Sequence, residues 1–241
     1  MQQQGRFRSW AATHAGTKRA HNEDRCVDRP DLGLWAIADG AGGHECGQLA
    51  AEIVTEALEA MPGDLSPADL LPAVRACIGE AHQRLRAEAA RRGNGVTLAS
   101  TIVVLLAGRS HYACLWAGDS RAYRVRNGEL LAITRDHSLV QEMLDAGAIS
   151  AEEAAAHPRG NVITRAVGCD AALVLDKATE VLCSGDRFLL CSDGLCKTLG
   201  DIELCALLAL PPDAQPAELL VAAALARSAA DNVSAVVVDV L

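Results

Sequence analysis

Four aspartates lie at the ends of apolar or helical segments, where their side chains could meet at one edge of a fold. They are Asp39 after LWAIA, Asp119 in CLWAGDSRAY, Asp193 after FLLCS, and Asp231 before NVSAVVV. One such aspartate is usually a turn or cap residue. Four together favour another interpretation, because clustered carboxylates repel unless a cation or a proton lies between them. Hard oxygen ligands of this kind suit Mg²⁺ or Mn²⁺, and no group of histidines and cysteines has zinc spacing.

The stretch ADGAGG places small residues directly after Asp39. Without a side chain, Gly40 lets the backbone approach an ion closely, so its carbonyl is a candidate ligand beside the Asp39 carboxylate. A carboxylate has two oxygens, and Asp39 is therefore also a candidate to bridge two metal ions.

The segment GTKRAHNED, residues 16–24, brings Arg19, Glu23 and Asp24 together shortly before the first expected strand. A solvated surface cluster is the ordinary reading of such charges. The functional interpretation is that the Arg19 guanidinium binds a phosphate through two hydrogen bonds, while the carboxylates of Glu23 and Asp24 face the metal ions.

Composition narrows the class of protein. The chain has 241 residues and a net charge of −9, so it lacks the basic excess that nucleic-acid binding requires. Nine cysteines, an odd number without a C-x-x-C pair, indicate buried thiols in a reducing compartment. The N-terminus lacks an apolar run of signal-peptide length, and IVVLLA at 102–107 is too short to span a bilayer. We therefore expect a cytoplasmic protein that binds neither nucleic acid nor membranes.

Apolar periodicity and turn signals predict the elements that must position these residues. Helices are expected at 47–60, 67–92, near 200 and at 216–230. Strands are expected at 33–39, 98–108, 111–119, 172–182, 186–192 and 233–240, with a further hairpin in RAYRVRNGEL around Asn127-Gly128. Strands joined by hairpins do not form a parallel doubly wound sheet. The sequence thus predicts the α+β class, with antiparallel sheets packed together and helices outside.

We expect one domain over residues 1–241, since no linker divides the chain. Residues 136–160 differ from their surroundings: they are helical in propensity, more polar, and interrupted by Gly and Pro. They are interpreted as an inserted surface segment or flap.

Eight fragments occur in an order that resembles the metal-dependent Ser/Thr protein phosphatases of the 2C type, in the compact bacterial form. They are GTKRAHNED, ADGAGG, ASTIVVLL, WAGDSRAYR, ITRDHS, VITRAVG, GDRFLLCSDGL and DNVSAVVV, between residues 16 and 238. The resemblance implies two antiparallel sheets packed face to face with helices on both sides, in four α-β-β-α layers. It also implies a two-metal centre in a cleft at one end of the sandwich.

The resemblance further implies a role for each candidate residue. Asp39 would bridge two Mn²⁺ or Mg²⁺ ions, and Asp193 and Asp231 would hold one of them. Glu23 and the Gly40 carbonyl would serve the other ion, Asp24 would bind metal-bound water, and Arg19 would bind the substrate phosphate. A third, weaker ion would use Asp119 with Asp193. A metal-bridging hydroxide would then hydrolyse phosphoserine or phosphothreonine without a covalent intermediate, and the flap would touch the substrate.

The chain departs from the family pattern at Ala41, where many eukaryotic members have a histidine that protonates the leaving alkoxide. His44 lies three residues further on and is not an aligned replacement, so the general acid is left unassigned. For His137 a capping or packing role is favoured, and His21 is not assigned to the site.

Two other functions are compatible with parts of this pattern. One is a non-catalytic phosphoprotein-binding regulator, which lost metal ligands would support; every metal position is filled here. The other is a sporulation- or stress-type phosphatase acting on an anti-sigma-factor antagonist, a class that usually carries extra sensor domains. The favoured partners are phosphorylated proteins and a cognate bacterial Ser/Thr kinase. The compact single-domain form makes a kinase that regulates a secretion system one candidate, and a monomer is expected.

Overall fold

The computed structural model describes residues 6–41, 45–93 and 95–241. Its strands form two antiparallel sheets. The first sheet has the order β1-β11-β10-β7-β8, with bounds Phe7–His14, Val233–Val240, Arg187–Cys191, Arg121–Arg126 and Glu129–Ala132. The second has the order β2-β3-β5-β6-β9, with bounds Asp24–Arg29, Leu34–Ala41, Ile102–Ala107, His111–Ala117 and Asp176–Val181; β4 (Ala99–Ser100) pairs with β3.

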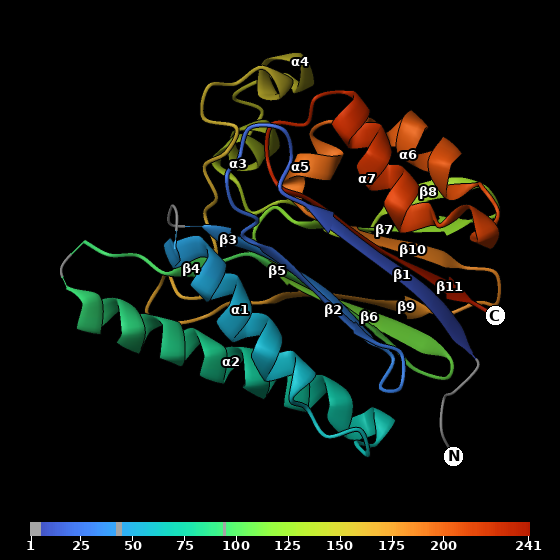
Figure 1. Cartoon of the computed structure of the whole chain (residues 1–241), viewed down its shortest axis with the longest axis horizontal. Helices are drawn as coiled ribbons and strands as arrows, with labels where there is room; N and C mark the ends of the chain where they lie inside the picture. The colour runs from blue at the N-terminus through green and yellow to red at the C-terminus, as the bar shows by residue number, and fades with distance from the viewer. Residues whose placement is uncertain (1–5, 42–44, 94) are drawn as a thin grey trace.

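Helices cover both outer faces of the two sheets (Figure 1). The helices α1 (Glu45–Glu59) and α2 (Pro67–Arg92) lie on the second sheet. The helices α5 (Asp193–Cys196), α6 (Asp201–Leu208) and α7 (Pro216–Ala226) lie on the first, and α3 (Leu139–Asp145) and α4 (Ala151–Ala155) lie at one end. A short 3₁₀ turn, Pro212–Ala214, precedes α7. The predicted α-β-β-α order of layers is confirmed.

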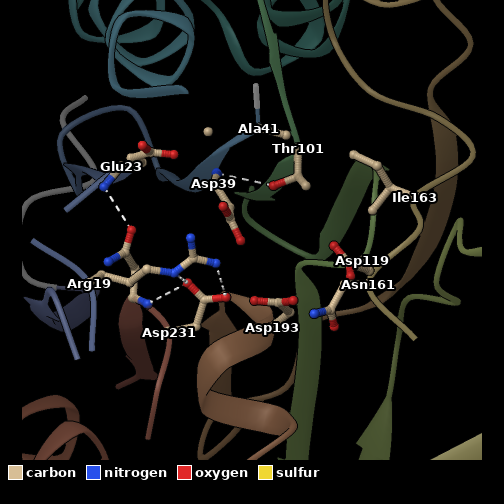
Figure 2. A pocket seen from close by; sticks show the side chains of 12 residues that line it. Arg19, Glu23, Asp39, Ala41, Thr101, Asp119, Asn161, Ile163, Asp193 and Asp231 are labelled. Atoms are coloured by element: carbon tan, nitrogen blue, oxygen red, sulfur yellow. Dashed lines mark hydrogen bonds and ion pairs between the residues drawn. The ribbon is translucent and has the colours of Figure 1, made fainter. Parts of the chain in front are cut away.

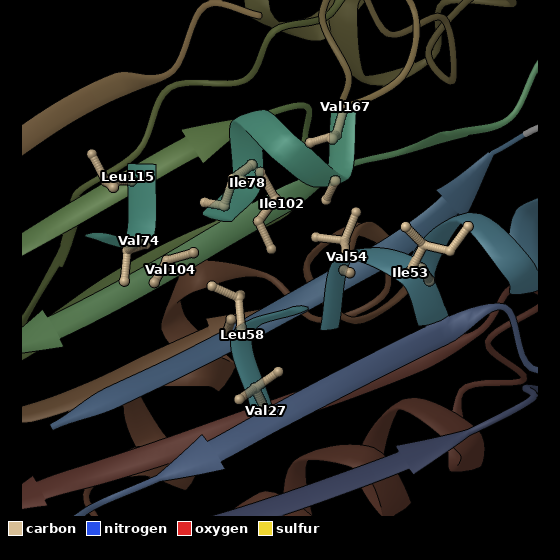
Figure 3. Close-up of a cluster of buried hydrophobic side chains, with 14 of the residues drawn as sticks. Val27, Ile53, Val54, Leu58, Val74, Ile78, Ile102, Val104, Leu115 and Val167 are labelled. Carbon is tan, nitrogen blue, oxygen red and sulfur yellow. The ribbon is translucent and has the colours of Figure 1, made fainter. Parts of the chain in front are cut away.

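Alternation of side chains along the strands builds three apolar layers. In β5, Ile102 and Val104 face α1 and α2, whereas Val103 and Leu105 face the other sheet. Figure 3 shows the first of these layers, with Leu58 of α1 packed near Val104 and Val27. Strand β5 reads as one unbroken apolar run because both of its faces are buried.

Several predicted bounds differ from the observed ones. Strands β1 and β2 and the short helix α5 were not predicted, and β9 begins four residues later than expected. Helix α7 ends at Ala226 and not at residue 230. Two residues after this end, Ser228 has a left-handed φ of 61°, which a helix does not allow. The predicted Asn127-Gly128 turn, which joins β7 to β8, is confirmed: both residues have a positive φ.

All nine cysteines are free thiols. Cys114 and Cys191 are buried as predicted, but Cys169 is exposed. In the described part of the chain, no helix combines the length and the apolar composition that a membrane span needs.

Candidate active site

An acidic pocket of about 220 Å³ lies at the end of the sandwich where β3, β6 and β10 end (Figure 2). It brings together all but one of the candidate residues, namely Arg19, Glu23, Asp39, Gly40, Asp119, Asp193 and Asp231. Ala41, Thr101, Asn161, Ile163 and Asn232 complete the lining. The pocket therefore takes side chains from both sheets and from the loops that join them.

Asp39 is fixed through its own backbone. Its amide donates to Thr101 Oγ1 at 3.1 Å, and its carbonyl accepts from the Thr101 amide at 2.8 Å. Thr101 Oγ1 also shares a hydrogen bond with Ser120 Oγ at 2.8 Å. Figure 2 shows the Asp39 carboxylate pointing from β3 toward Asp193 and Asp231. The ASTI motif thus positions a carboxylate on the neighbouring strand.

Asp24 is the candidate residue that does not line the pocket. It lies opposite Asp39 in the β2–β3 register and is 1% exposed. Its Oδ2 accepts from Ser234 Oγ at 2.6 Å, while its buried Oδ1 has no hydrogen-bond partner. Burial raises the pKa of Asp24 to about 7. The hydrogen bonds from Ser234 and Ser192 lower this pKa, and the negative charges of Asp193 and Asp231 raise it further.

The same forces act on half-buried Asp39 and on buried Asp119. Burial, and then the charges of Asp24 and Asp193, raise the pKa of Asp39 well above its ordinary value. Burial and the Asp193 charge raise the pKa of Asp119 to about 6. The pocket therefore holds more carboxylates than it can keep ionised at neutral pH unless cations neutralise them.

The donor set fits divalent cations. The oxygens of the carboxylates are hard ligands, which divalent cations prefer. The buried Oδ1 of Asp24 accepts no hydrogen bond, so it is available to a group that a bound cation would bring. The backbone also approaches closely at two glycines: a Cβ on Gly40 would lie 2.0 Å from the Gly47 carbonyl oxygen, and one on Gly47 would lie 2.3 Å from Glu23 Oε2. A side chain at Gly47 would fill the space beside Glu23.

The carboxylates are nevertheless not gathered around one point. Within the described residues, no three acidic, histidine or cysteine side chains form a group ready to hold a metal ion. Basic side chains take their charge instead: Arg19 makes two contacts of 2.9 Å with Asp231, and Lys197 contacts Asp193. Because Arg19 and Lys197 lie on different sides of the pocket, the carboxylates that pair with them are held apart from one another.

Asn232 positions the segment that carries Arg19 and Glu23. Its Oδ1 accepts from the Glu23 amide at 2.8 Å, and its Nδ2 donates to the carbonyls of Ala15 and His21. The sequence prediction missed this role, although Asn232 stands in the fragment DNVSAVVV. It also missed Thr101, Asn161 and Lys197, because their neighbours in space lie far away in the chain.

The histidines occupy peripheral places. His21 is exposed and does not line the pocket. His137 is buried, accepts from the Gly118 amide at 3.2 Å and stacks on Trp116. Ala41 lines the pocket and offers no proton. His44 lies outside the described residues.

These raised pKa values predict a pH dependence of the metal-free protein. A carboxyl whose folded pKa exceeds its unfolded value binds more protons in the native state, so stability falls as pH rises between the two values. For Asp24 that window runs from about 4 to about 7. We expect chelator-treated protein to lose roughly 2 kcal/mol, or about 4–8 °C in Tm, between about pH 5 and pH 7.5.

Thermal melts in chelator measure this dependence, and Asp24→Asn is the control. The variant retains an acceptor for Ser234 but cannot ionise, so its Tm should change less with pH. Equal pH dependence in both proteins would contradict the prediction.

Comparison with known proteins relates nearly the whole chain to solved structures. The structure of PppA, described as a key regulatory component of T6SS in Pseudomonas aeruginosa, matches 98% of this chain and 99% of its own with a TM-score of 0.91 and 42% identity. The catalytic domain of PstP, a serine/threonine protein phosphatase of Mycobacterium tuberculosis, was solved in complex with two manganese ions. It matches 98% of this chain and 99% of its own with a TM-score of 0.82 and 34% identity.

The shared fold is that of solved bacterial serine/threonine phosphatases. The family model described as Protein phosphatase 2C matches residues 13–211. The protein phosphatase PhpP of Streptococcus pneumoniae is 34% identical over 239 residues, which cover 94% of this chain and 95% of PhpP. The chain belongs to the protein phosphatase 2C family. It spans only 44% of the length of full PstP, to which it is 34% identical.

Proposed function

We propose that the chain hydrolyses phosphoserine and phosphothreonine in proteins with the aid of two Mn²⁺ or Mg²⁺ ions. The single observation that carries this proposal is the pocket in which five carboxylates, poorly hydrated at Asp39 and Asp119, lie beside an accessible arginine. A buried acidic cluster costs folding free energy, so it is maintained where a cation or a reaction uses it.

Five groups would hold the ions: the carboxylates of Glu23, Asp39, Asp193 and Asp231 and the carbonyl of Gly40. When bound, such ions lower the pKa of water and neutralise negative charge on phosphoryl oxygens. Asp39 lies between the others in the pocket, with Glu23 and Asp119 on opposite sides of it in Figure 2. It is therefore the residue best placed to serve two ions.

Arg19 and Asp24 would act on the substrate and on water. The Arg19 side chain is 58% exposed, and its planar fork already holds the two oxygens of Asp231. A cation on Asp231 would release this fork to bind two phosphate oxygens. Asp24 keeps its Oδ1 free of any partner beneath the pocket, so it can accept a hydrogen bond from water there. No side chain is assigned to protonate the leaving alkoxide, because Ala41 has no proton to donate.

We further propose that residues 136–160 form a flap that contacts the substrate within a single domain. They include α3 and α4, and the chain that follows them supplies Asn161 and Ile163 to the pocket. A peptide bound at the phosphate site would therefore pass close to the end of this segment.

The proposed partners are phosphorylated proteins and the Ser/Thr kinase that modifies them, in the cytoplasm and with the phosphatase as a monomer. The free cysteines and the acidic net charge support this setting. The 42% identity to PppA favours a kinase that regulates a secretion system.

Hydrolysis of a phosphothreonine peptide tests the function. Chelator should reduce phosphate release to background, and added Mn²⁺ or Mg²⁺ should restore it, because the acidic pocket needs cations to bind an anionic ester. A phosphotyrosine peptide of the same sequence should be hydrolysed at least about tenfold more slowly. Activity that survives chelation would contradict the metal-dependent mechanism, and no activity with either ion would favour the non-catalytic regulator.

A further inference from the structure

Lys197 places a positive charge against two carboxylates at one side of the pocket. It follows α5, one helical turn after Asp193. Its Nζ donates to Asp193 Oδ2 at 2.6 Å, to Asp119 Oδ2 at 3.2 Å and to Asn161 Oδ1 at 3.0 Å. An ammonium group has three protons, so each has one acceptor here.

The surroundings of this ammonium are those of a cation site. The side chains of Asp119 and Asp193 are only 4% and 14% exposed, whereas that of Lys197 is 35% exposed. Two carboxylates this close together and this poorly hydrated need a positive charge between them. Lys197 contacts Oδ2 of Asp193, which leaves Oδ1 of the same residue for an ion at the centre of the pocket.

The sequence resemblance implied a third, weaker metal ion on Asp119 and Asp193. A divalent ion at that position would have to displace the ammonium group, because two cations cannot share the same oxygens without strong repulsion. Lys197 is covalently attached, so it competes with a metal ion at a high effective concentration.

We propose that Lys197 takes the place of a third metal ion, so that the chain binds two exchangeable ions and supplies the third positive charge itself. This inference rests on the proposed two-metal phosphatase. It also makes Lys197 a positioning residue, because the same ammonium holds Asn161 at the end of the 136–160 segment against the catalytic carboxylates.

Counting metal ions tests the proposal without relying on activity. Chelator-treated protein is titrated with Mn²⁺ by calorimetry, and free Mn²⁺ is followed by electron paramagnetic resonance. The wild type should bind two ions. Lys197→Met, which removes the charge but retains an unbranched side chain, should bind a third ion at least about tenfold more weakly than the first two. Lys197→Arg retains the charge and should bind two.

A second substitution shows where the extra ion binds. Adding Asp119→Asn to Lys197→Met should return the count to two, while Asp119→Asn alone should leave the wild-type count unchanged. Three ions in the wild type, with one lost in Asp119→Asn, would overturn the proposal. If Lys197→Met does not fold, this comparison of wild type with Asp119→Asn still decides the question. Two bound ions without hydrolysis of phosphopeptide would contradict the proposed function and leave this inference standing.

Discussion

Asp39→Asn is expected to lower kcat/KM for a phosphothreonine peptide by about 10³-fold, because cation stabilisation of the transition state amounts to several kcal/mol. The asparagine retains the shape and one oxygen, but it loses the charge that would hold two ions. Phosphate release from the peptide, measured with saturating Mn²⁺, gives the effect.

The same substitution should stabilise the metal-free protein. Burial and the neighbouring carboxylates raise the pKa of Asp39, so an ionised Asp39 is unfavourable in the folded state at neutral pH. Removing that charge should raise the Tm of chelator-treated protein by several degrees at about pH 7.5. This opposition of activity and stability is typical of a residue retained for function.

Asp64→Asn is the matched control, since Asp64 is exposed in the loop between α1 and α2. It should change neither kcat/KM nor Tm measurably. A fully active Asp39→Asn enzyme would contradict the assignment of Asp39, and so would a metal-free Tm below that of the wild type.

Gly40→Ala is expected to have the second-largest effect. A Cβ on Gly40 would lie 2.0 Å from the Gly47 carbonyl oxygen and 2.4 Å from its carbonyl carbon. Both atoms belong to the backbone of α1, so relief requires the helix and strand β3 to move apart. We expect a loss of about 3 kcal/mol in the free energy of unfolding and, because the Gly40 carbonyl moves, about a 100-fold loss of kcat/KM.

Gly79→Ala makes the same chemical change where no atom lies within 4 Å of the added Cβ. Gly79 is inside helix α2, where alanine is favoured over glycine by roughly 0.5–1 kcal/mol. Denaturant unfolding of both variants should therefore give shifts of opposite sign. A Gly40→Ala protein as stable and active as the wild type would show that β3 and α1 are not in the close contact described.

The sequence allowed prediction of the elements whose pattern is local. Strand β5 and helix α1 have apolar periodicities that need no partner to be recognised. Strand β1, FRSWAATH, has no such pattern: it exists because all eight residues pair with β11, from Phe7 with Val240 to His14 with Val233. Strand β11 was predicted from its own apolar run, but its pairing with β1 leaves no signal in the β1 segment alone.

The candidate site was predictable to the same extent. Asp39 and Asp193 stand out because a carboxylate ends an apolar run, and the motif order supplied the rest. Lys197 could not be found in this way, since a lysine after a short helix is an ordinary surface residue. Only the fold brings it to Asp119, 78 positions earlier in the chain.

The acids of the site come from both sheets: Asp39, which lines the pocket, and Asp24, buried beside it, lie on one sheet, and Asp193 and Asp231 lie on segments attached to the other. The spacing between these two pairs of acids is therefore set by the apolar layer between the sheets, where Trp35 of β3 and Phe188 of β10 are buried. Side chains outside the pocket thus determine how far apart the proposed metal ligands stand. A methylene gained or lost in the middle of the sandwich would change turnover by altering that separation.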